Sequence, residues 1–209
     1  MKITDIIKQN NSNNRYNIFI DDDYAFSASL EDIVKYSIKL NSEITKEQLD
    51  ILIECCEENK CYNYALFLLG KKDYTQYEIS KKLSDKGYSL NVINKTIDKL
   101  KMYDIINDER YAKKYINDCL NIKKYGRRKI EYYLQKKGIE LDLLKEVFFN
   151  SDSEYKNAIE IIQKKVKHYK DNKDIKNKLI RHLMSKGFEY DVIKEALKSI
   201  KLEDDGEDI

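Results

Sequence analysis

The chain has 209 residues and no proline, 42% of its residues are hydrophobic, and its formal net charge is +2. The lack of proline permits long helices, and this apolar content suits several small helical cores better than one large globule. No stretch approaches the roughly 18 apolar residues of a membrane span, and the N-terminal sequence MKITDIIKQN lacks the apolar region of a signal peptide. We therefore expect a cytoplasmic protein with no membrane partner.

The N-terminal part of the chain differs in composition from the rest and predicts a small cap. Arg15–Asp21 and Tyr24–Ser29 are rich in aromatic and β-prone residues, and the aspartates between them can form the turn of a hairpin. Lys2–Lys8 is a candidate third strand. A short helix over Leu30–Ile38 and a longer one over Ile44–Cys55, which leads into the next region, complete a β-rich α/β cap.

An eleven-residue pattern then occurs three times. It reads LSDKGYSLNVI from Leu83, LQKKGIELDLL from Leu134 and LMSKGFEYDVI from Leu183. Each copy ends one helix with a lysine and a glycine, continues with an apolar residue and starts a new helix. A glycine at this place can adopt the left-handed conformation that closes a helix, and the lysine meets the negative helix end. The three glycines, about 50 residues apart, are Gly87, Gly138 and Gly187.

A further helical segment precedes each copy, so the repeating unit has three helices. These segments are Tyr62–Lys72, Asp108–Leu120 and Glu154–Tyr169. Thr75 and Glu78 have the spacing of a capping box, and Asp108 is a good N-cap for the helix that follows it.

The sequence therefore predicts a mainly α fold. Three tandem three-helix, helix-turn-helix-like repeats, with nine helices, form an elongated array behind the small β-rich α/β cap. The expected boundaries are 1–58 for the cap, 59–105, 106–150 and 151–202 for the repeats, and 203–209 for an acidic disordered tail.

Residue types that support catalysis or metal binding are few and scattered. Cys55, Cys56, Cys61 and Cys119 match no common zinc spacing, and the two histidines, His168 and His182, are far from them in sequence. Neither histidine lies in a catalytic signature, and no glycine-rich phosphate-binding loop is present. We expect no metal site, no cofactor and no enzymatic activity.

Positive charge is concentrated in the middle of the chain. Residues 61–150 carry 19 basic and 12 acidic side chains, whereas residues 1–60 carry 7 and 12. Five cations, at Lys123, Lys124, Arg127, Arg128 and Lys129, lie within seven residues around Gly126. Such a run is most often a solvated loop, but three of its members fall in the first turn of a predicted helix, where the helix dipole disfavours cations. This placement favours an anionic partner.

Three stretches, YALFLLGKKDYTQYEISKKLSDKGYSLNVINKTIDKL, INDERYAKKYI and YGRRKIEYYLQKKGI, lie between Tyr62 and Phe148. Together they resemble the RecX family, the bacterial regulators of the recombinase RecA. The resemblance extends more weakly through the third repeat, and RYNIFIDDDYAFSAS is similar to a β-rich extension of members from low-GC Gram-positive bacteria. Members of the family are built from tandem three-helix repeats, which the glycine period predicts independently.

The resemblance assigns two motifs to this chain. One is the acidic–basic motif, Asp108, Glu109, Arg110 and Tyr111, and the other is the glycine–basic motif, Gly126, Arg128, Lys129 and Ile130. The family usually has proline where this chain has Arg127, which leaves the start of that helix less constrained. The residues expected to contact the partner are Arg110, Lys123, Lys124, Arg127, Arg128, Lys129, Lys136 and Lys137. Those expected to be structural are Gly87, Gly126, Gly138, Gly187, Asp108, Glu109 and Tyr111.

The partner that the resemblance implies is the RecA filament on single-stranded DNA. Members of the family lie in the helical groove of that filament and suppress strand exchange, ATP hydrolysis and repressor cleavage. We therefore expect a monomer that inhibits RecA, contacts single-stranded DNA within the filament and binds free DNA weakly. Two other classes stay open: a tandem helix-turn-helix protein that binds duplex DNA directly, and a helical scaffold for an unrelated protein.

Overall fold

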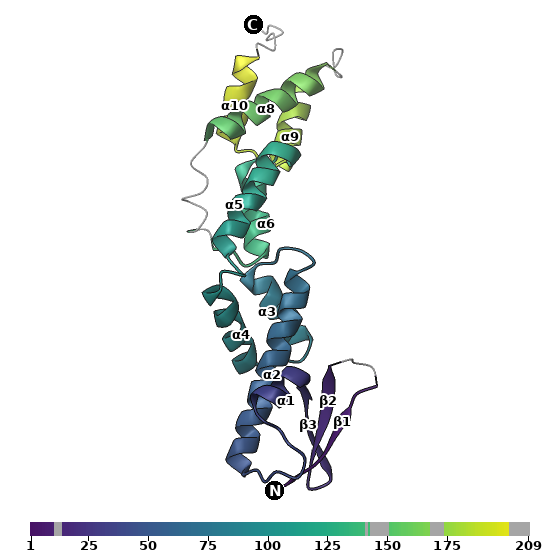
Figure 1. Cartoon of the computed structure of the whole chain (residues 1–209). Coiled ribbons are helices and arrows are strands. Elements are labelled where there is room, and N and C mark those ends of the chain that lie inside the picture. Colours follow the sequence, from purple (N-terminus) through teal and green to yellow (C-terminus); the bar gives the residue numbers. More distant parts are fainter. Residues whose placement is uncertain (11–13, 141, 143–150, 168–173, 201–209) are drawn as a thin grey trace, which may run out of the picture. The chain divides into compact units, whose positions relative to one another are not determined.

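The computed structural model of the protein describes residues 1–10, 14–140, 142, 151–167 and 174–200. Within these residues lie nine α-helices, one π-helix and one three-stranded sheet, so the predicted mainly helical fold with a small N-terminal sheet is confirmed (Figure 1). The chain divides into two compact units. The first comprises Met1–Tyr74 and Ile79–Ile106, and the second comprises Thr75–Glu78 and Asn107–Ile209. None of the described helices is long and apolar enough to cross a membrane.

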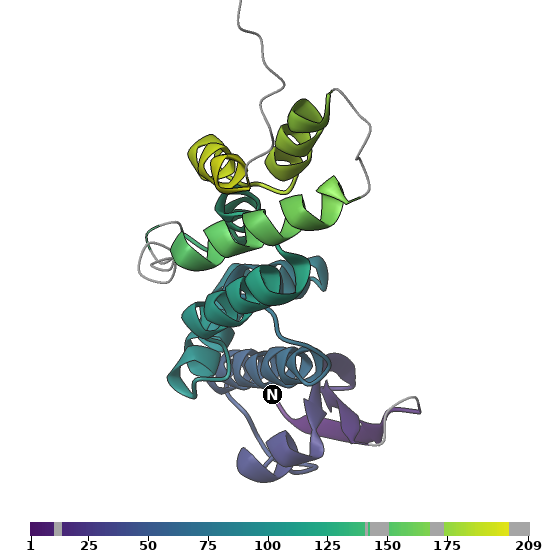
Figure 2. The same ribbon diagram turned by 90° about the horizontal axis from the view of Figure 1, so that it is seen from above.

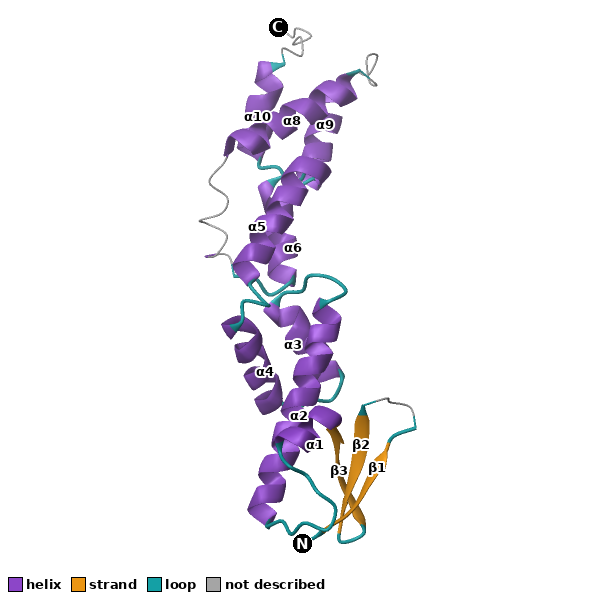
Figure 3. Cartoon of the chain, in the orientation of Figure 1, coloured by secondary structure: helices purple, strands orange, loops and turns teal. Residues whose placement is uncertain are grey.

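The first unit begins with an antiparallel sheet of strand order β1-β2-β3 (Figure 3). Its strands are β1 (Ile3–Lys8), β2 (Arg15–Ile20) and β3 (Asp23–Ser29), which confirms the hairpin and the candidate third strand. The hairpin turn consists of Asp21 and Asp22, with φ of 50° and 70°. Two left-handed residues match the twist of a hairpin, and aspartate tolerates this conformation.

Helix α1 (Leu30–Lys35) follows the sheet, and helix α2 (Lys46–Leu69) is one continuous helix of 24 residues. The two segments predicted over Ile44–Cys55 and Tyr62–Lys72 are thus parts of a single helix. Its first half buries Leu52 and Cys56 against the sheet, and its second half buries Cys61 and Ala65 in the core of the first repeat. The predicted boundary after residue 58 falls inside this helix.

The first repeat is completed by α3 (Gln76–Asp85) and α4 (Leu90–Met102). Buried apolar residues from these helices and from the second half of α2 form one core. Its central members are Ala65, Leu68, Ile79, Leu83, Ile93, Ile97 and Leu100.

The second unit contains the other helices that the structure describes. They are α5 (Asp108–Asp118), the π-helix η1 (Cys119–Lys123), α6 (Arg127–Lys136), α8 (Ser151–Val166), α9 (Ile175–Ser185) and α10 (Tyr190–Ser199). Helices α8, α9 and α10 enclose one apolar core and lie together in both views (Figures 1 and 2). The predicted third helix of the second repeat, with Leu143, Leu144 and Phe148, and the predicted acidic tail lie outside the described residues.

The three repeated glycines end their helices as predicted. Gly87, Gly138 and Gly187 have φ of 93°, 77° and 88°. At each turn the glycine N–H donates to the carbonyl three residues earlier, and the next N–H donates to the carbonyl five residues earlier. These are the two hydrogen bonds of a Schellman ending, and the repeated pattern therefore specifies the same helix ending three times.

Candidate functional site

The basic run of the second unit is shaped by an interruption between α5 and α6. Helix α5 passes into the π-helix Cys119–Lys123, and Lys124 adopts a left-handed conformation with φ of 53°. The N–H groups of Lys124 and Tyr125 both donate to the Cys119 carbonyl, and α6 begins after Gly126. Lys123 and Lys129 are thereby both placed within 6 Å of the centre of the Tyr125 ring, at 5.9 and 4.5 Å. π-Helical turns of this kind are frequent at functional sites.

Three lysines surround the ring of Tyr125. The ammonium nitrogens of Lys129, Lys186 and Lys123 lie 4.5, 5.5 and 5.9 Å from its centroid. Two of them are fixed by backbone carbonyls, since Lys129 donates to Ser185 at 3.0 Å and Lys186 donates to Lys123 at 3.1 Å. Within the described residues, none of the three has an ion pair. We call Lys123, Tyr125, Lys129 and Lys186 the Tyr125 cluster.

The electrostatics of the Tyr125 cluster are those of uncompensated positive charge. Burial lowers the pKa of Lys186, and the charges of Lys129 and Lys165 lower it further. Burial also lowers the pKa of the neighbouring His182, with added effects from Lys165 and Lys186. A bound anion would attract these lysines and would stabilise the charged forms of Lys186 and His182.

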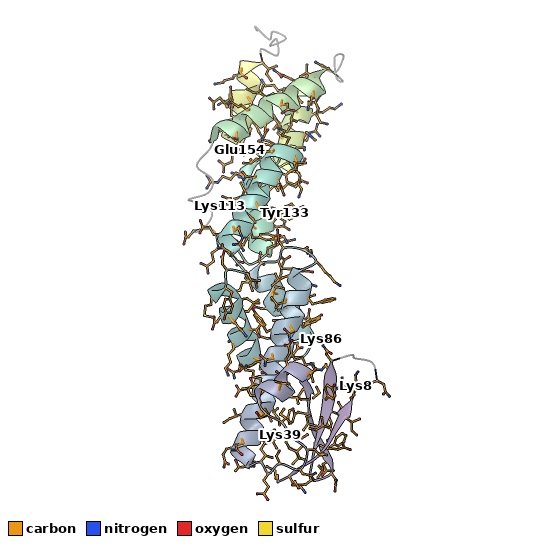
Figure 4. All side chains as sticks on the ribbon, in the orientation of Figure 1. Lys8, Lys39, Lys86, Lys113, Tyr133 and Glu154 are labelled. Carbon is orange, nitrogen blue, oxygen red and sulfur yellow. The ribbon has the colours of Figure 1, made fainter. Side chains whose placement is uncertain are left out.

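Exposed tyrosines extend the cluster along α6. Tyr133 stacks on Tyr125 with ring centroids 6.5 Å apart and touches Tyr132 edge-on at 5.5 Å (Figure 4 labels Tyr133). Tyr132 is 51% exposed and Tyr133 37% exposed, and the Lys136 ammonium lies 4.4 Å from the Tyr132 ring. The Tyr125 cluster with Tyr132, Tyr133 and Lys136 is hereafter the Tyr–Lys surface. Exposed aromatic rings between cations are typical of surfaces that bind single-stranded nucleic acid.

The other predicted contact residues are not part of this surface. Lys124 pairs with Glu160 at 3.2 Å, Arg127 with Glu131 at 2.7 Å, and Lys137 with Glu78 at 2.6 Å. Arg128 projects from the first turn of α6, where it is 65% exposed and lies 3.8 Å from Glu189. Arg110 lies on the first turn of α5 and lines a shallow pocket with Asn107, Glu109 and Lys113. Of the eight predicted contact residues, the structure therefore places three in the Tyr–Lys surface: Lys123, Lys129 and Lys136.

The predicted role of Asp108 needs a correction. The N-cap of α5 is Asn107, whose side-chain oxygen accepts from the Arg110 N–H at 2.8 Å. Asp108 is the first helical residue, and its carboxylate instead accepts from the N–H of Gln76, the first residue of α3, at 2.8 Å. Of two adjacent residues that can cap a helix, the one with extended backbone takes that role.

Glu109 and Tyr111, the other members of the acidic–basic motif, contact residues of the second unit. Glu109 forms an ion pair with Lys113 one turn later on α5. Tyr111 stacks on Tyr115 with an interplanar angle of 11°, and the Lys137 ammonium lies 5.3 Å from its ring. Tyr111 therefore lies next to the lysine of the Gly138 turn.

Arg127, at the position where the resemblance implies proline, uses the backbone N–H that a proline would lack. This N–H donates to Glu154 Oε1 at 2.9 Å, just as the Gln76 N–H donates to Asp108. Burial raises the pKa of Glu154, and the Arg127 hydrogen bond opposes that rise (Figure 4 labels Glu154). A carboxylate at the helix N-terminus also offsets the unfavourable effect of Arg127 on the helix dipole. Arg127 is thus accounted for without an external partner.

Sequence reasoning missed Lys186 and the three tyrosines of the Tyr–Lys surface. The repeated pattern predicts only that Lys186 is a cation at a helix end, since Lys86 and Lys137 occupy the same place in the other two copies. The tyrosines carried a usable signal, since Tyr125, Tyr132 and Tyr133 interleave with the basic residues of 123–137. Interleaved aromatic and basic residues on one helix predict a stacking surface.

Groups suited to metal binding do not gather in the part of the chain that the structure describes, where no three His, Cys, Asp or Glu side chains could hold a metal ion. Cys56, Cys61 and Cys119 are buried core residues, and burial raises the pKa of Cys56 to about 12. Such thiols are protonated at neutral pH and act as small apolar side chains.

Sequence comparison relates the chain to known families. The Regulatory protein RecX N-terminal domain matches residues 1–45, and the first, second and third three-helix domains of RecX match residues 61–100, 107–147 and 152–197. The Regulatory protein RecX of Clostridium botulinum (strain Alaska E43 / Type E3) is 37% identical over 203 residues, 94% of this chain and 95% of that one. That of Caldanaerobacter subterraneus subsp. tengcongensis is 34% identical over 197 residues, 94% of this chain and 98% of that one.

Solved structures agree with these matches. A crystal structure of regulatory protein RecX has a TM-score of 0.71 to this chain, at 24% identity over 93% of this chain and 98% of that one, and shows the fold alone. The crystal structure of RecX from Lactobacillus salivarius has a TM-score of 0.66, at 28% identity over 70% of this chain and 97% of that one.

Tandem three-helix repeats behind a small sheet, with lysines and tyrosines gathered on one surface, define a helical-repeat protein suited to binding. The family matches make that class specific. The chain belongs to the RecX family of regulatory proteins.

Proposed function

We propose that the protein regulates a RecA recombinase by binding the RecA filament on single-stranded DNA. It lies in the helical groove of the filament and inhibits strand exchange, ATP hydrolysis and coprotease activity. It acts in the cytoplasm, as a monomer, by binding and not by catalysis. Family membership supports the partner, and an elongated array of repeats, which stays a prediction, would let successive repeats contact successive filament subunits.

The Tyr–Lys surface is the observation that carries this proposal. A filament on single-stranded DNA presents phosphates, unpaired bases and acidic protein side chains, and this surface offers cations and exposed rings together. The three ammonium groups around Tyr125 have no carboxylate partner among the described residues, so an anionic partner meets them without first breaking an ion pair.

The test is the DNA-dependent ATPase of RecA, measured while the protein is titrated into filaments on single-stranded DNA. Inhibition should fall at least about tenfold in potency for the double variant Lys123→Glu and Arg128→Glu, because both residues are exposed, Lys123 belongs to the surface and Arg128 precedes its member Lys129. Arg127→Glu is a poor choice, since it would place a third acid beside Glu131 and Glu154. Lys81→Glu, an exposed cation on α3, is the matched control.

A second function, direct binding of duplex DNA, is favoured by the tight turn between helices α9 and α10, which resembles a helix-turn-helix connection. The comparison of partners separates the two. Affinity for RecA assembled on single-stranded DNA should exceed affinity for naked duplex by at least roughly tenfold, or about 1.4 kcal/mol, at physiological salt. Equal affinities would overturn the filament proposal in favour of a duplex-binding protein.

A further inference from the structure

The second unit contains two equivalent arrangements of a helix start and a glycine turn. In one, Thr75–Glu78 contacts the turn at Gly138, and the Thr75 hydroxyl donates to the Lys137 carbonyl at 2.6 Å. In the other, the start of α6 contacts the turn at Gly187, and the Gly126 N–H donates to the Lys186 carbonyl at 3.0 Å. The repeat pattern places Glu78 and Lys129 at equivalent positions.

The two arrangements differ in charge at one pair of positions. At the Gly138 turn the lysine before the glycine, Lys137, is paired with the Glu78 carboxylate at 2.6 Å. At the Gly187 turn the equivalent lysine, Lys186, meets Lys129 in place of a carboxylate, and Lys123 joins them around Tyr125. The pKa directions follow this difference, since the pKa of Lys186 is lowered and that of Lys137 is raised.

The contrast shows which chemical group would complete the second arrangement. The Gly138 turn supplies its own carboxylate, whereas the Gly187 turn has two cations and a tyrosine ring where that carboxylate would be. An oxyanion from outside the chain that contacted both Lys129 and Lys186 would take over the role of Glu78. The backbone carbonyls of Ser185 and Lys123 already hold both ammonium groups in position, so little ordering is needed on binding.

We propose that the Tyr125 cluster binds a backbone phosphate of single-stranded nucleic acid, with an adjacent base stacked on Tyr132 or Tyr133. The proposal deepens the proposed function, on which it rests for the source of the strand. Exposed rings next to the cations favour a nucleic acid over an acidic peptide, because a base has a flat face that stacks on tyrosine. Stacking requires an unpaired base, which favours a single strand over a duplex.

The site is shared between two repeats. Lys123, Tyr125 and Lys129 come from the second repeat, and Lys186 comes from the third, at the end of α9. Gly126 makes this possible, because a Cβ at that position would lie 2.3 Å from the Phe188 nitrogen. Binding of a strand at the cluster therefore also stabilises the contact between the start of α6 and the Gly187 turn.

The experiment measures binding of a fluorescent oligothymidylate of 20 nucleotides to the full-length protein without RecA, by anisotropy at several salt concentrations. Lys186→Met should weaken binding about tenfold or more and lower the salt slope by about 0.7, as expected for one lost phosphate contact. Lys137→Met removes the equivalent but paired lysine and should leave affinity within about twofold. Equal losses for the two variants would overturn the proposal.

Two further variants test the geometry and the stacking. Lys129→Glu copies the Gly138 arrangement, so it should abolish oligothymidylate binding without lowering the melting temperature, since an acid in the first turn of α6 suits the helix dipole. Tyr132→Ala should weaken binding about fivefold or more, whereas Tyr103→Ala, at a comparably exposed tyrosine, should not. Unchanged binding by Lys129→Glu, or equally tight binding of an oligoglutamate of the same charge, would overturn the proposal.

The ATPase of RecA, measured with the same variants, separates this inference from the proposed function. Wild-type protein that inhibits RecA but does not bind oligothymidylate refutes the phosphate site and leaves the proposed function standing. Protein that binds oligothymidylate through Lys186 and does not affect RecA refutes the proposed function and leaves the phosphate site standing.

Discussion

The glycine turns at Gly138 and Gly187 have the same backbone but opposite side-chain chemistry. Both are Schellman endings, and each receives the start of a preceding helix whose first N–H is bound by an acid, Asp108 for α3 and Glu154 for α6. At the first turn a lysine forms an ion pair with a carboxylate, and at the second two lysines lie around one tyrosine ring. The fold therefore repeats while its charges do not, and the candidate site lies where the charge pattern changes.

The two turns also differ in how closely the chain approaches them. A Cβ on Gly138 would lie 2.3 Å from the Tyr77 Cβ, and one on Gly187 would lie 2.3 Å from the Lys129 Cβ and 2.4 Å from the Lys129 backbone nitrogen. At Gly87 a Cβ would have no neighbour within 4 Å. The three turns therefore need glycine for the same backbone conformation, and two of them need it for space as well.

Alanine at the three glycines should produce the largest differences in stability. Gly87→Ala incurs only the left-handed strain, about 1 kcal/mol, whereas Gly187→Ala adds overlap with Lys129, for a further loss of about 1–3 kcal/mol. Urea unfolding followed by circular dichroism gives the totals, and amide exchange of Tyr88 and Phe188 reports each turn locally. Gly138→Ala should fall between them, because its new Cβ would overlap the Tyr77 side chain, whereas that of Gly187→Ala would also overlap the Lys129 backbone. Equal losses at Gly87 and Gly187 would mean that the close approach at Gly187 is not maintained in solution.

The next largest effect concerns the lysine of each turn. Lys137→Met keeps the aliphatic chain but leaves the half-buried Glu78 without its partner, and should cost about 1 kcal/mol of stability. Lys186→Met removes a cation that its neighbours repel, and should change stability by less than about 0.5 kcal/mol. The melting temperatures of both variants at neutral pH check this order. A larger loss for Lys186→Met would show that its hydrogen bond to the Lys123 carbonyl outweighs the repulsion.

The sequence predicted the backbone of these turns because a local pattern determines it. A lysine, a glycine and an apolar residue after a helical face are sufficient for a Schellman ending, and all three endings formed. The sequence predicted two helices where the structure has the single helix α2. The reason is that the buried face shifts between Leu52 and Cys56 on one side and Cys61 and Ala65 on the other, although no helix-breaking residue lies between them. Two cores share one helix, and only tertiary packing shows where one core ends.

The candidate site was less predictable, because the role of a charged residue depends on its partners in space. Lys123, Lys124 and Arg127 lie in one run, yet Lys124 pairs with Glu160 of α8 and Arg127 with Glu131, while Lys123, beside Tyr125, has no ion pair among the residues that the structure describes. Lys186 lies 57 residues after Lys129 in the sequence. A contact across that separation leaves no local signal.

The two turn lysines, Lys137 and Lys186, should also titrate differently. Burial lowers the pKa of Lys137, but its hydrogen bonds to Glu78 and the Tyr111 hydroxyl outweigh burial, so the net pKa is raised. Its stabilising effect is therefore present at neutral pH and is lost as pH rises through that raised pKa. The pKa of Lys186 is lowered, so folding is favoured as pH rises and Lys186 loses its proton. Lysine Cε resonances in NMR should titrate earlier for Lys186 than for Lys137, and the reverse order would contradict the charge contrast.

The smallest expected effect concerns the acid that holds the start of α6. Burial raises the pKa of Glu154 above its ordinary value of 4.5, so the folded chain binds the proton more readily than the unfolded chain. The associated stability is present below pH 4.5 and is lost as pH rises through the folded pKa. Glu154→Gln keeps an oxygen that can accept from the Arg127 N–H and removes the buried charge. The variant should therefore gain stability relative to wild type between pH 4 and pH 7.5, by only about 0.5 kcal/mol or less, in paired thermal melts. If wild type instead gains stability relative to the variant, the hydrogen bond from the Arg127 N–H to the charged carboxylate contributes more than burial of that charge costs. Glu154 would then stabilise the start of α6 as a charged acid, as Asp108 is placed to do at the start of α3.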